Sequence, residues 1–449
     1  MPQPAPRPRR RASVSRVLLP ALLLAGAPGA LHAQAAEPDS AIARAAAAVR
    51  ELAAVCGSAL WPEGLCGRIV LVDPRTRMAL ASSPVPADGF RPAAAGFVGP
   101  LPDALPLANT AVTWGGHRWS VVLLPLPVER YARLKLLIHE SFHRIQPALG
   151  LYGADPVNAH LDGQAGRVWM RMELRALARA LRAADGEAAS AAVGDALLFR
   201  AYRHALLPGS DTLEAALERQ EGLAEYTGAT LALAATGETR ERVARDVENA
   251  EAGSSFVRSF AYATGPSLGM LLDRRAPGWR RDPAALRDPA AALARAMRFR
   301  APSSPRRRAE ARARGYGHAA VAADEAVRSA AHRARLARYE ALFARPVLRF
   351  PAVRELNRVF DPGNVVSLGG RGTVYPTGVF NAEWGRLEVG SVGALLGAGQ
   401  TILVPAPEDP RASPPRGPGW TLQLAPGWEI RPWPGRPGDY EVARAGDAR

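Results

Sequence analysis

His139-Glu140-Ser141-Phe142-His143 lies within a run from residue 128 to residue 146 whose apolar residues recur with helical spacing. The next residue is a proline, which cannot continue a helix, so the spacing predicts one helix that ends at this point. Residues four apart project from the same face of a helix, and the imidazoles of His139 and His143 are therefore expected to reach one ion. Glu140, one position further round, can contact a water on that ion. The stretch predicts a metal site on a helix.

The third protein ligand is expected from a carboxylate on a later helix, because a hydrolytic zinc site has three protein ligands and one open position. Glu221 and Glu225 are four residues apart within Gln220-Glu221-Gly222-Leu223-Ala224-Glu225-Tyr226, a helical stretch. Glu173, on an intervening predicted helix, is the alternative ligand, although it lies among arginines that would hold it in an ion pair. The simpler interpretation of the two histidines is a pair that stabilises the helix near its C-terminus.

The two motifs together resemble those of the gluzincin metallopeptidases, in which an HExxH helix is completed by a glutamate from a later helix, often within E-G-x-A-x-Y. The resemblance implies a bound Zn²⁺ and five site residues: His139, His143 and Glu221 as ligands, Glu140 as general base, and Glu225 as the carboxylate that orients a ligating histidine. It covers these two motifs and the order of strand and helix around them. The interval between His143 and Glu221 is longer than in many gluzincins, which keeps the alternative ligand open.

Donors for a developing oxyanion are expected beside the metal. The candidates are Tyr262, Arg258 one turn before it, and Tyr226, although a packed aromatic ring or a surface arginine explains each of them at least as well. His160, in a predicted loop, is a further candidate, but a lone histidine in a loop is more often structural. In gluzincins the strand before the HExxH helix commonly pairs with the substrate. The strand predicted for residues 119–124 occupies that place, so we expect a peptide to add along its edge.

The charge of the chain is strongly basic but has no pattern that indicates a nucleic-acid partner. Lys and Arg number 57 against 42 Asp and Glu, which gives a formal net charge of +15. Lys135 is the only lysine, and the arginines are scattered beside glutamates in predicted helices instead of forming one stripe. No nucleic-acid recognition motif accompanies them. We therefore expect no nucleic acid as partner.

The N-terminal sequence predicts export. Residues 1–35 have the pattern of a signal peptide, with a basic stretch at Arg7–Arg11, an apolar run at Val17–Gly26 and a small-residue cleavage site. A periplasmic or secreted chain without stable membrane insertion after cleavage is expected, and a retained anchor is the alternative. Cys56 and Cys66 are the only cysteines, and an oxidising compartment favours a local disulfide between them.

The order of predicted elements indicates an α+β chain with a mainly helical zincin-like domain and a C-terminal antiparallel β-domain. After the signal peptide, residues 36–350 are expected to form the metallohydrolase domain, with strands in 36–126 and helices in 127–350, and residues 351–449 a small β-rich domain. The strands expected before the site helix are 68–72, 78–81 and 119–124. The helices expected after it are 166–184, 190–206, 212–236, 238–250, 256–274 and a charged helical region at 302–345.

These residues lead to one preferred function and two alternatives. The preferred function is an exported zinc metallopeptidase acting on a peptide or protein substrate. A zinc hydrolase of non-peptide amides or esters would use the same site. A non-catalytic envelope-binding protein on a metallopeptidase scaffold is the third hypothesis, and the presence of Glu140 argues against it, because a site without catalysis needs no base. The oligomeric state is left open.

Overall fold

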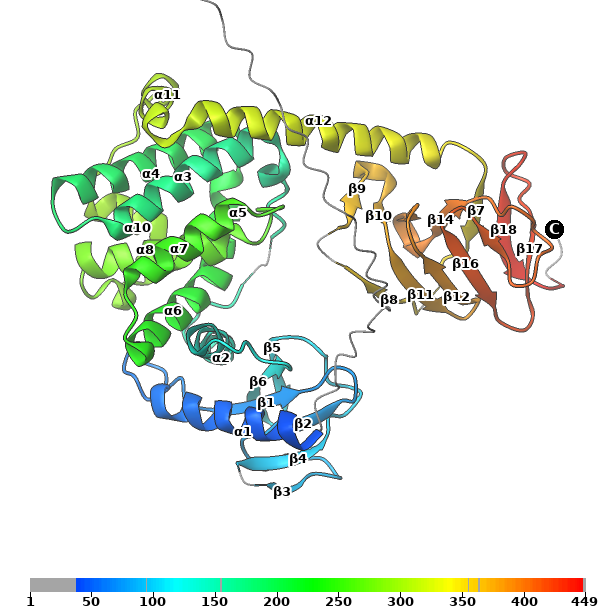
Figure 1. Ribbon diagram of the computed structural model, residues 1–449, viewed down its shortest axis with the longest axis horizontal. Helices are drawn as coiled ribbons and strands as arrows, with labels where there is room; N and C mark the ends of the chain where they lie inside the picture. The colour runs from blue at the N-terminus through cyan, green and yellow to red at the C-terminus, as the bar shows by residue number, and fades with distance from the viewer. Residues whose placement is uncertain (1–37, 94, 154–155, 354, 362–363, 447–449) are drawn as a thin grey trace, which may run out of the picture.

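The computed structural model describes residues 38–449 except 94, 154–155, 354, 362–363 and 447–449 (Figure 1). The chain is α+β, with most helices in the middle and many strands in the C-terminal region, as expected. An N-terminal sheet with helix α1 (Pro38–Val55), a helical lobe and a C-terminal pair of sheets follow one another along the chain. The predicted signal peptide, residues 1–35, lies outside the described residues. Within the described part, no helix is both long and apolar enough to cross a membrane.

The N-terminal sheet has six strands in the order β3-β4-β2-β1-β6-β5. The strands are β1 (Arg68–Val72), β2 (Met78–Ala81), β3 (Arg91–Ala93), β4 (Gly96–Pro100), β5 (Thr110–Trp114) and β6 (His117–Leu123). Strands β1 and β6 are parallel, and the other neighbours are antiparallel. The predicted strands β1, β2 and β6 are confirmed. The sequence pattern does not predict β3, β4 or β5, which are short and in two cases interrupted by Pro or Gly.

The expected substrate-pairing edge at residues 119–124 is wrong in position. Strand β6 lies inside the sheet between β1 and β5, so its backbone groups are already paired. Strand β5 forms the edge, and it turns into β6 at Gly115-Gly116, where both residues have positive φ. A Gly-Gly pair between two strands is a hairpin signal, because glycine adopts positive φ without steric cost. That signal was present in the sequence and indicates the extra strand.

Apolar residues cover both faces of the N-terminal sheet. Ile69 and Leu71 belong to the main core shared with the helices, whereas Val70 and Val72 face a second cluster with Trp119. The alternation of side chains along a strand explains this division. Helix α2 contributes to the main core cluster and therefore packs on that face of the sheet.

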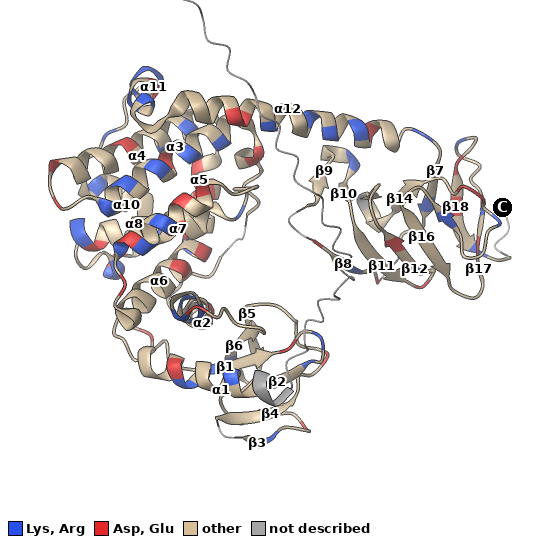
Figure 2. Cartoon of the chain, in the orientation of Figure 1, with Lys and Arg blue, Asp and Glu red and all other residues tan. Residues whose placement is uncertain are grey.

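The helical lobe contains helices that agree with most of the predicted spans. Its helices are α2 (Arg130–Ile145), α3 (Gln164–Arg182), α4 (Glu187–Leu206), α5 (Ser210–Leu217), α6 (Leu223–Thr236), α7 (Arg240–Glu251), α8 (Phe260–Arg275), α9 (Pro283–Arg287), α10 (Pro289–Ala296), α11 (Arg306–Ala313) and α12 (His318–Leu342). The helix expected at 212–236 is interrupted by a π-helical turn, Glu218–Gly222, and the region expected at 302–345 is two helices with a turn at Gly317. Basic and acidic positions are interspersed over this lobe (Figure 2).

Helices α9 and α10 were not expected, although the sequence contains their start signals. Each begins with an aspartate followed by proline, and the Asp282 and Asp288 side chains accept hydrogen bonds from backbone N–H groups in the first turn. Proline at the first helical position and a preceding aspartate cap are both typical of helix N-termini.

The C-terminal part has two sheets, of which one is not purely antiparallel. The seven-stranded sheet has the order β17-β18-β7-β14-β13-β10-β9, and the five-stranded sheet β15-β16-β12-β11-β8. The strands are β7 (Val347–Phe350), β8 (Asn357–Phe360), β9 (Val366–Ser367), β10 (Thr373–Tyr375), β11 (Gly378–Ala382), β12 (Gly385–Val389), β13 (Ala394–Leu396), β14 (Ile402–Pro405), β15 (Arg416–Gly417), β16 (Trp420–Leu424), β17 (Trp428–Pro432) and β18 (Tyr440–Arg444). Strands β18 and β7 pair in parallel, which corrects the expected antiparallel β-domain.

The boundary expected at residue 350 is also too late. Strand β7 pairs with β14 and β18, so the C-terminal sheets begin before residue 350, directly after α12. Their apolar residues form cores of their own, one around Phe350 and Trp384 and one around Tyr339 at the end of α12. The four-residue run Val347–Phe350 is too short for its period to separate it from the preceding helix.

Candidate metal centre

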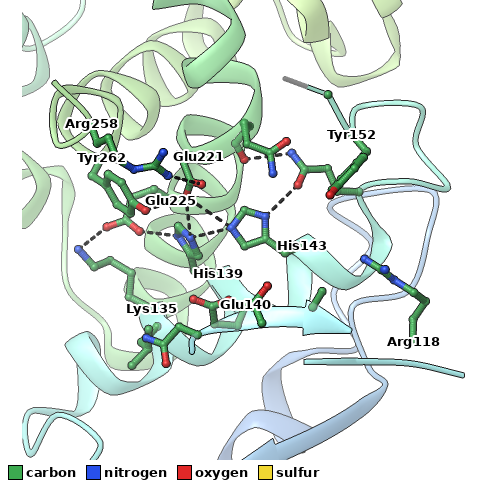
Figure 3. A pocket seen from close by; sticks show the side chains of 17 residues that line it. Arg118, Lys135, His139, Glu140, His143, Tyr152, Glu221, Glu225, Arg258 and Tyr262 are labelled. Carbon is green, nitrogen blue, oxygen red and sulfur yellow. Dashed lines mark hydrogen bonds and ion pairs between the residues drawn. The ribbon is translucent and has the colours of Figure 1, made fainter. Parts of the chain in front are cut away.

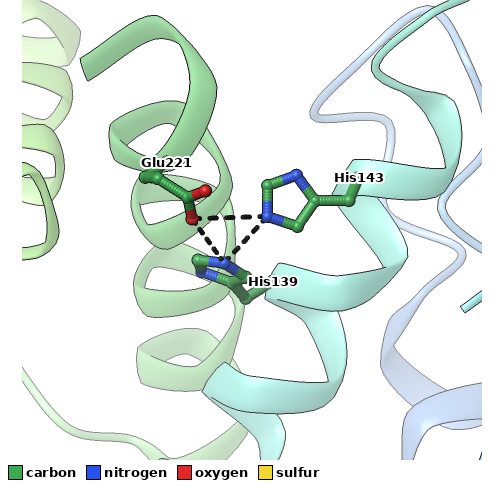
Figure 4. A group of neighbouring side chains, drawn as sticks. All are labelled: His139, His143 and Glu221. Atoms are coloured by element: carbon green, nitrogen blue, oxygen red, sulfur yellow. Dashed lines mark hydrogen bonds and ion pairs between the residues drawn. The ribbon is translucent and has the colours of Figure 1, made fainter. Parts of the chain in front are cut away.

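Helix α2 carries the two histidines on the face that is turned toward Glu221 (Figure 4). The side chains of His139 and Glu140 are buried, and His143 is half-buried. The Nε2 atoms of the two histidines are 3.0 Å apart. Because this spacing follows from four residues of regular helix, the sequence predicted it correctly.

Glu221 meets the two histidines from the other side. Its Oε2 atom lies 3.4 Å from His139 Nε2 and 3.5 Å from His143 Nε2. These three residues form a group whose ligand atoms all lie within 4.8 Å of one another. Glu221 lies in the π-helical turn at 218–222, and such turns occur often at functional sites because the extra residue redirects a side chain.

Two glycines allow the helices around the site to approach closely. A Cβ atom on Gly228 in α6 would lie 2.5 Å from the backbone oxygen of Lys135 in α2. A Cβ atom on Gly265 in α8 would lie 2.3 Å from the Cα of Gly222. Contacts this short are not tolerated by real Cβ atoms, so both positions require glycine. The close packing brings Glu221 within reach of helix α2.

The Nδ1 nitrogen of each histidine, which does not face Glu221, is held by a hydrogen bond (Figure 3). His139 Nδ1 lies 2.7 Å from Glu225 Oε2, and Glu225 in turn pairs with Lys135 at 2.7 Å. His143 Nδ1 lies 2.8 Å from Gln146 Oε1. The Gln146 amide nitrogen donates to two backbone carbonyls, which leaves the amide oxygen to accept from His143. Both histidines therefore carry a proton on Nδ1 and direct Nε2 toward Glu221.

Charge in the site is divided between acidic and basic groups. Burial would lower the pKa of His139, but hydrogen bonds to Glu221 and Glu225 outweigh it and raise the pKa to about 10. Burial opposes ionisation of both carboxylates. Hydrogen bonds from the histidines nevertheless hold the pKa of Glu221 well below its ordinary value, and His139 and Lys135 lower the pKa of Glu225 to about 2. Both carboxylates are therefore ionised at neutral pH.

Glu140 differs from the other two carboxylates because no group binds it. Its Oε2 atom is buried and has no hydrogen-bond partner among the described residues. Burial raises the pKa of the Glu140 carboxyl, and the two neighbouring histidines oppose that shift. The Ser120 hydroxyl of β6 donates to the Glu140 backbone carbonyl at 2.9 Å, which fixes this part of α2 against the sheet. A carboxylate with a raised pKa and a free oxygen has the properties of a proton acceptor.

A cavity of about 590 Å³ opens beside these groups. The lining includes Arg118 and the start of β5 as well as the metal-site residues of α2 and the π turn (Figure 3). Tyr262 donates to Glu221 Oε2 at 2.7 Å, and its ring stacks on that of His139 with 5.5 Å between centroids. Arg258 approaches Glu221 Oε1 at 3.3 Å. Both expected oxyanion donors thus lie at the cavity, each bound to the carboxylate.

Tyr226, the third expected donor, does not reach the cavity. It is fully buried, and its hydroxyl donates to Asp273 Oδ2 at 2.8 Å and accepts from Arg280 at 2.6 Å. Its ring packs on Trp279 in the interior of the lobe. The prediction is wrong because Tyr226 lies one residue past Glu225, on a different face of α6.

Glu173, the alternative ligand, and His160 also lie elsewhere. Glu173 and two later glutamates are paired with two arginines in what we call the arginine–glutamate cluster: Glu173, Glu214, Glu218, Arg200 and Arg203. His160 lies in a short 3₁₀ turn and contacts Glu214 at 2.9 Å. All members of the cluster are buried. The ion pair expected for Glu173 is present, but it is internal and extends over two arginines.

Three residues of the site were not expected from the sequence. Gln146 and Lys135 position the histidines, and Arg118 lines the cavity from strand β6. Gln146 follows His143 by three residues and therefore shares its helix face, which was a usable signal. Lys135 precedes His139 by four residues and therefore shares the helix face of His139, which was a similar signal. Arg118 had no signal of this kind, because its place depends on how the sheet packs on α2.

The Cys56–Cys66 disulfide, which the sequence predicted, is present between α1 and β1.

Comparison with protein families, curated proteins and solved structures gives no match to a family model, to a curated protein or to a solved structure. The resemblance to gluzincins therefore stays a prediction from the two sequence motifs.

Proposed function

We propose that the protein is a zinc-dependent metallohydrolase, and most specifically a peptidase. The observation that carries this proposal is the convergence of His139, His143 and Glu221 beside a cavity in which Glu140 has an unbound carboxylate oxygen. Most buried polar groups in proteins have a hydrogen-bond partner, so an unbound carboxylate oxygen beside a cavity is consistent with a chemical role. A histidine and carboxylate set with an adjacent free base is typical of catalytic zinc sites.

Two of the three separations between the ligand atoms match those expected around zinc, and the third is shorter by about 0.3 Å. Zinc bonds of about 2.0–2.2 Å in tetrahedral geometry separate neighbouring ligand atoms by about 3.3–3.6 Å. The Nε2 and Oε2 atoms of this site are 3.0, 3.4 and 3.5 Å apart. Two imidazole nitrogens and one carboxylate oxygen also make a donor set that suits zinc better than magnesium or calcium, which prefer oxygen ligands. His139, His143 and Glu221 would hold the ion.

A bound zinc ion would supply a Lewis acid that acidifies water and polarises a scissile carbonyl. Glu140 is the residue of this chain that accepts the proton from the attacking water and returns it to the leaving amine. Its buried and unpaired Oε2 atom is suited to that role, since no other donor competes for it. Glu225 and Gln146 orient both imidazoles, because each accepts a hydrogen bond from a histidine Nδ1 and leaves the Nε2 atom to face the metal position.

Tyr262 and Arg258 are proposed to stabilise negative charge that develops on the substrate. Both contact Glu221 and line the cavity, so a small side-chain rotation would turn either donor toward a bound carbonyl. In the observed arrangement Tyr262 also orients the Glu221 carboxylate. The Tyr262 hydroxyl would therefore orient Glu221 before the reaction and stabilise the negative charge on the substrate during it.

The edge of strand β5 supports a peptide as the substrate. Asn109, Thr110 and Ala111 line the cavity at the start of this strand, and its outer side has no strand neighbour among the described residues. An extended peptide can add to such an edge through backbone hydrogen bonds. A peptide added at this edge would lie beside the cavity that Glu140 also lines. Small esters and amides would not use the edge.

Export remains part of the proposal. The disulfide between Cys56 and Cys66 supports an oxidising compartment, because such bonds persist in secreted and periplasmic proteins and are rare in the cytosol. We propose a periplasmic or secreted location after removal of residues 1–35.

The test combines metal content with turnover. Zinc is measured by elemental analysis on the wild type, on Glu221→Gln, and on Glu187→Gln, a matched change at an exposed glutamate of α4. We expect about one zinc per chain in the wild type and the control and a loss in Glu221→Gln, together with cleavage of a mixed peptide library that a chelator abolishes and zinc restores. Absence of zinc from the wild type after zinc loading, or cleavage that a chelator does not affect, would overturn the proposal.

A further inference from the structure

Three cationic side chains other than histidine line the cavity close to the metal centre, and only two of them face a carboxylate. Lys135 is paired with Glu225, and Arg258 with Glu221. Arg118 forms no hydrogen bond or ion pair with the residues that the structure describes, and its Nε atom is buried. A buried donor without an acceptor is unfavourable, so this part of the cavity is incomplete without a ligand.

Arg118 projects toward the metal centre from the sheet. The Ser120 hydroxyl binds the Glu140 carbonyl, so this face of β6 lies on helix α2. Arg118 precedes Ser120 by two residues and therefore extends from the same face, about 7 Å along the strand. In Figure 3 the Arg118 side chain lies on the His143 side of the cavity, opposite Lys135. The guanidinium is thus near the substrate path but away from the residues that hold the metal.

A second arginine adds positive charge at the same place. Arg144, next to His143, donates only to the backbone carbonyls of Gly64, Leu65 and Cys66 within the described chain. Arg118 lies close enough to Arg144 for their two positive charges to interact. The two guanidinium groups therefore repel each other, and no described carboxylate neutralises them. An anionic group from outside would relieve both costs.

We infer that Arg118 is a specificity-determining residue that receives a carboxylate of the substrate, which defines the substrates as acidic peptides or peptides held by their C-terminus. The inference rests on the proposed peptidase function and names its substrate class. A guanidinium presents two parallel donors that match a carboxylate, which gives both affinity and orientation. Because Arg118 and Glu140 line the same cavity, we expect the carboxylate to lie near the scissile bond in the substrate sequence.

The experiment compares matched peptides on the zinc-loaded protein. In the first set of fluorescent peptides, one position near the cleaved bond, on either side of it, is Glu or Gln, and the C-terminus is amidated. In the second set, two peptides of the same sequence differ only in whether the C-terminus is free or amidated. We expect kcat/KM to favour one carboxylate position by about tenfold to a hundredfold, the range for a charged hydrogen bond. A preference confined to the Glu/Gln pairs identifies the bound carboxylate as an acidic side chain of the substrate. A preference confined to the last pair identifies it as the C-terminal carboxylate.

Variants of Arg118 assign the preference to that residue. In Arg118→Gln the ratio falls to about one, and in Arg118→Glu the protein prefers the peptide with Lys at the same position. Arg91→Gln, at an exposed arginine on strand β3, is the matched control and retains the wild-type ratio. Added salt is expected to reduce the wild-type preference, because it screens partly exposed charges.

Failure of this inference is distinguishable from failure of the peptidase proposal. Equal cleavage of the Glu and Gln peptides and of the free and amidated peptides, in wild type and Arg118→Gln alike, overturns the inference and leaves the peptidase intact. If no peptide is cleaved, binding of the same fluorescent peptides is measured by anisotropy. Tighter binding of the carboxylate peptide to wild type than to Arg118→Gln supports the inference without turnover, and equal binding overturns it.

Discussion

The helical stretch from residue 210 to residue 236 contributes carboxylates to two buried clusters that differ in their cations. In the arginine–glutamate cluster, Glu218 forms an ion pair with Arg200 and Glu214 forms one with Arg203. In the candidate metal centre, Glu221 faces two histidines beside a cavity. Guanidinium groups are permanently charged and have no lone pair to offer, whereas an imidazole can ligate a metal once it is neutral. The comparison teaches that the partner, more than the buried carboxylate, decides whether a cluster is structural or chemical.

The π-helical turn at 218–222 supplies one carboxylate to each of the two clusters. Glu218, at its start, turns inward to Arg200 and Thr264, and Glu221 turns to the histidines. In a regular helix these residues, three apart, would share one face. The extra residue of the turn is therefore a means of serving two sites from one helix.

The largest effect is expected from removing Glu140, the proposed general base of the candidate metal centre. Glu140→Gln should lower kcat of peptide cleavage by about a hundredfold to ten-thousandfold, because a positioned general base contributes that factor. Zinc content and thermal stability should stay at the wild-type level, since Glu140 is not a ligand and has an unsatisfied oxygen. The measurement is steady-state kinetics with metal analysis of the same sample. Unchanged kcat in a zinc-loaded variant would exclude Glu140 as the base.

The arginine–glutamate cluster should respond in stability instead. Arg203→Leu leaves Glu214 and Glu173 partly uncompensated in the interior, and removal of one partner of a buried pair costs about 3–5 kcal/mol. We expect this loss in the free energy of unfolding measured with urea, while the folded fraction keeps its zinc. The double variant Arg203→Leu/Glu214→Leu should recover part of the loss. A single variant as stable as the wild type would show that the cluster contributes nothing.

A smaller effect is expected from the carboxylate that orients His139. Glu225→Gln retains a hydrogen-bond acceptor but removes the charge that faces His139 and Lys135. Zinc affinity should fall by about tenfold to a hundredfold, as for other changes behind a ligating histidine. Competition with a fluorescent chelator measures it, and Glu187→Gln serves as the matched control. An affinity equal to that of the control would mean that Glu225 does not orient the ligand.

The smallest expected effect concerns acid stability of the arginine–glutamate cluster. Burial would raise the pKa of Glu214, but Arg203 and two histidines hold it well below 4.5. The unfolded chain therefore takes up this proton first, so the stabilisation is complete above pH 4.5 and is lost as the pH falls toward the folded pKa. Below pH 4.5 the group contributes a slope of about 1.4 kcal/mol per pH unit. Unfolding at several pH values should show a correspondingly flatter profile for Glu214→Gln, and parallel profiles would contradict the assignment.

The pattern of the sequence was sufficient for the helices and for part of the centre. His139, Glu140 and His143 follow from one helical period, and Glu221 with Glu225 from a second, because neighbours on a helix face are set by the local backbone. The spans of the long helices followed from the same periodicity. The disulfide between Cys56 and Cys66 could be predicted because these are the only two cysteines of the chain.

Only the tertiary structure decided which elements meet. It separated Glu173 and Tyr226 from the centre, made β5 instead of β6 the edge of the sheet, and brought Arg118 to the cavity. It also moved the start of the C-terminal sheets to β7. These outcomes depend on contacts between segments far apart in the chain, such as the close approach of helices at Gly228, and local periodicity contains no information about them.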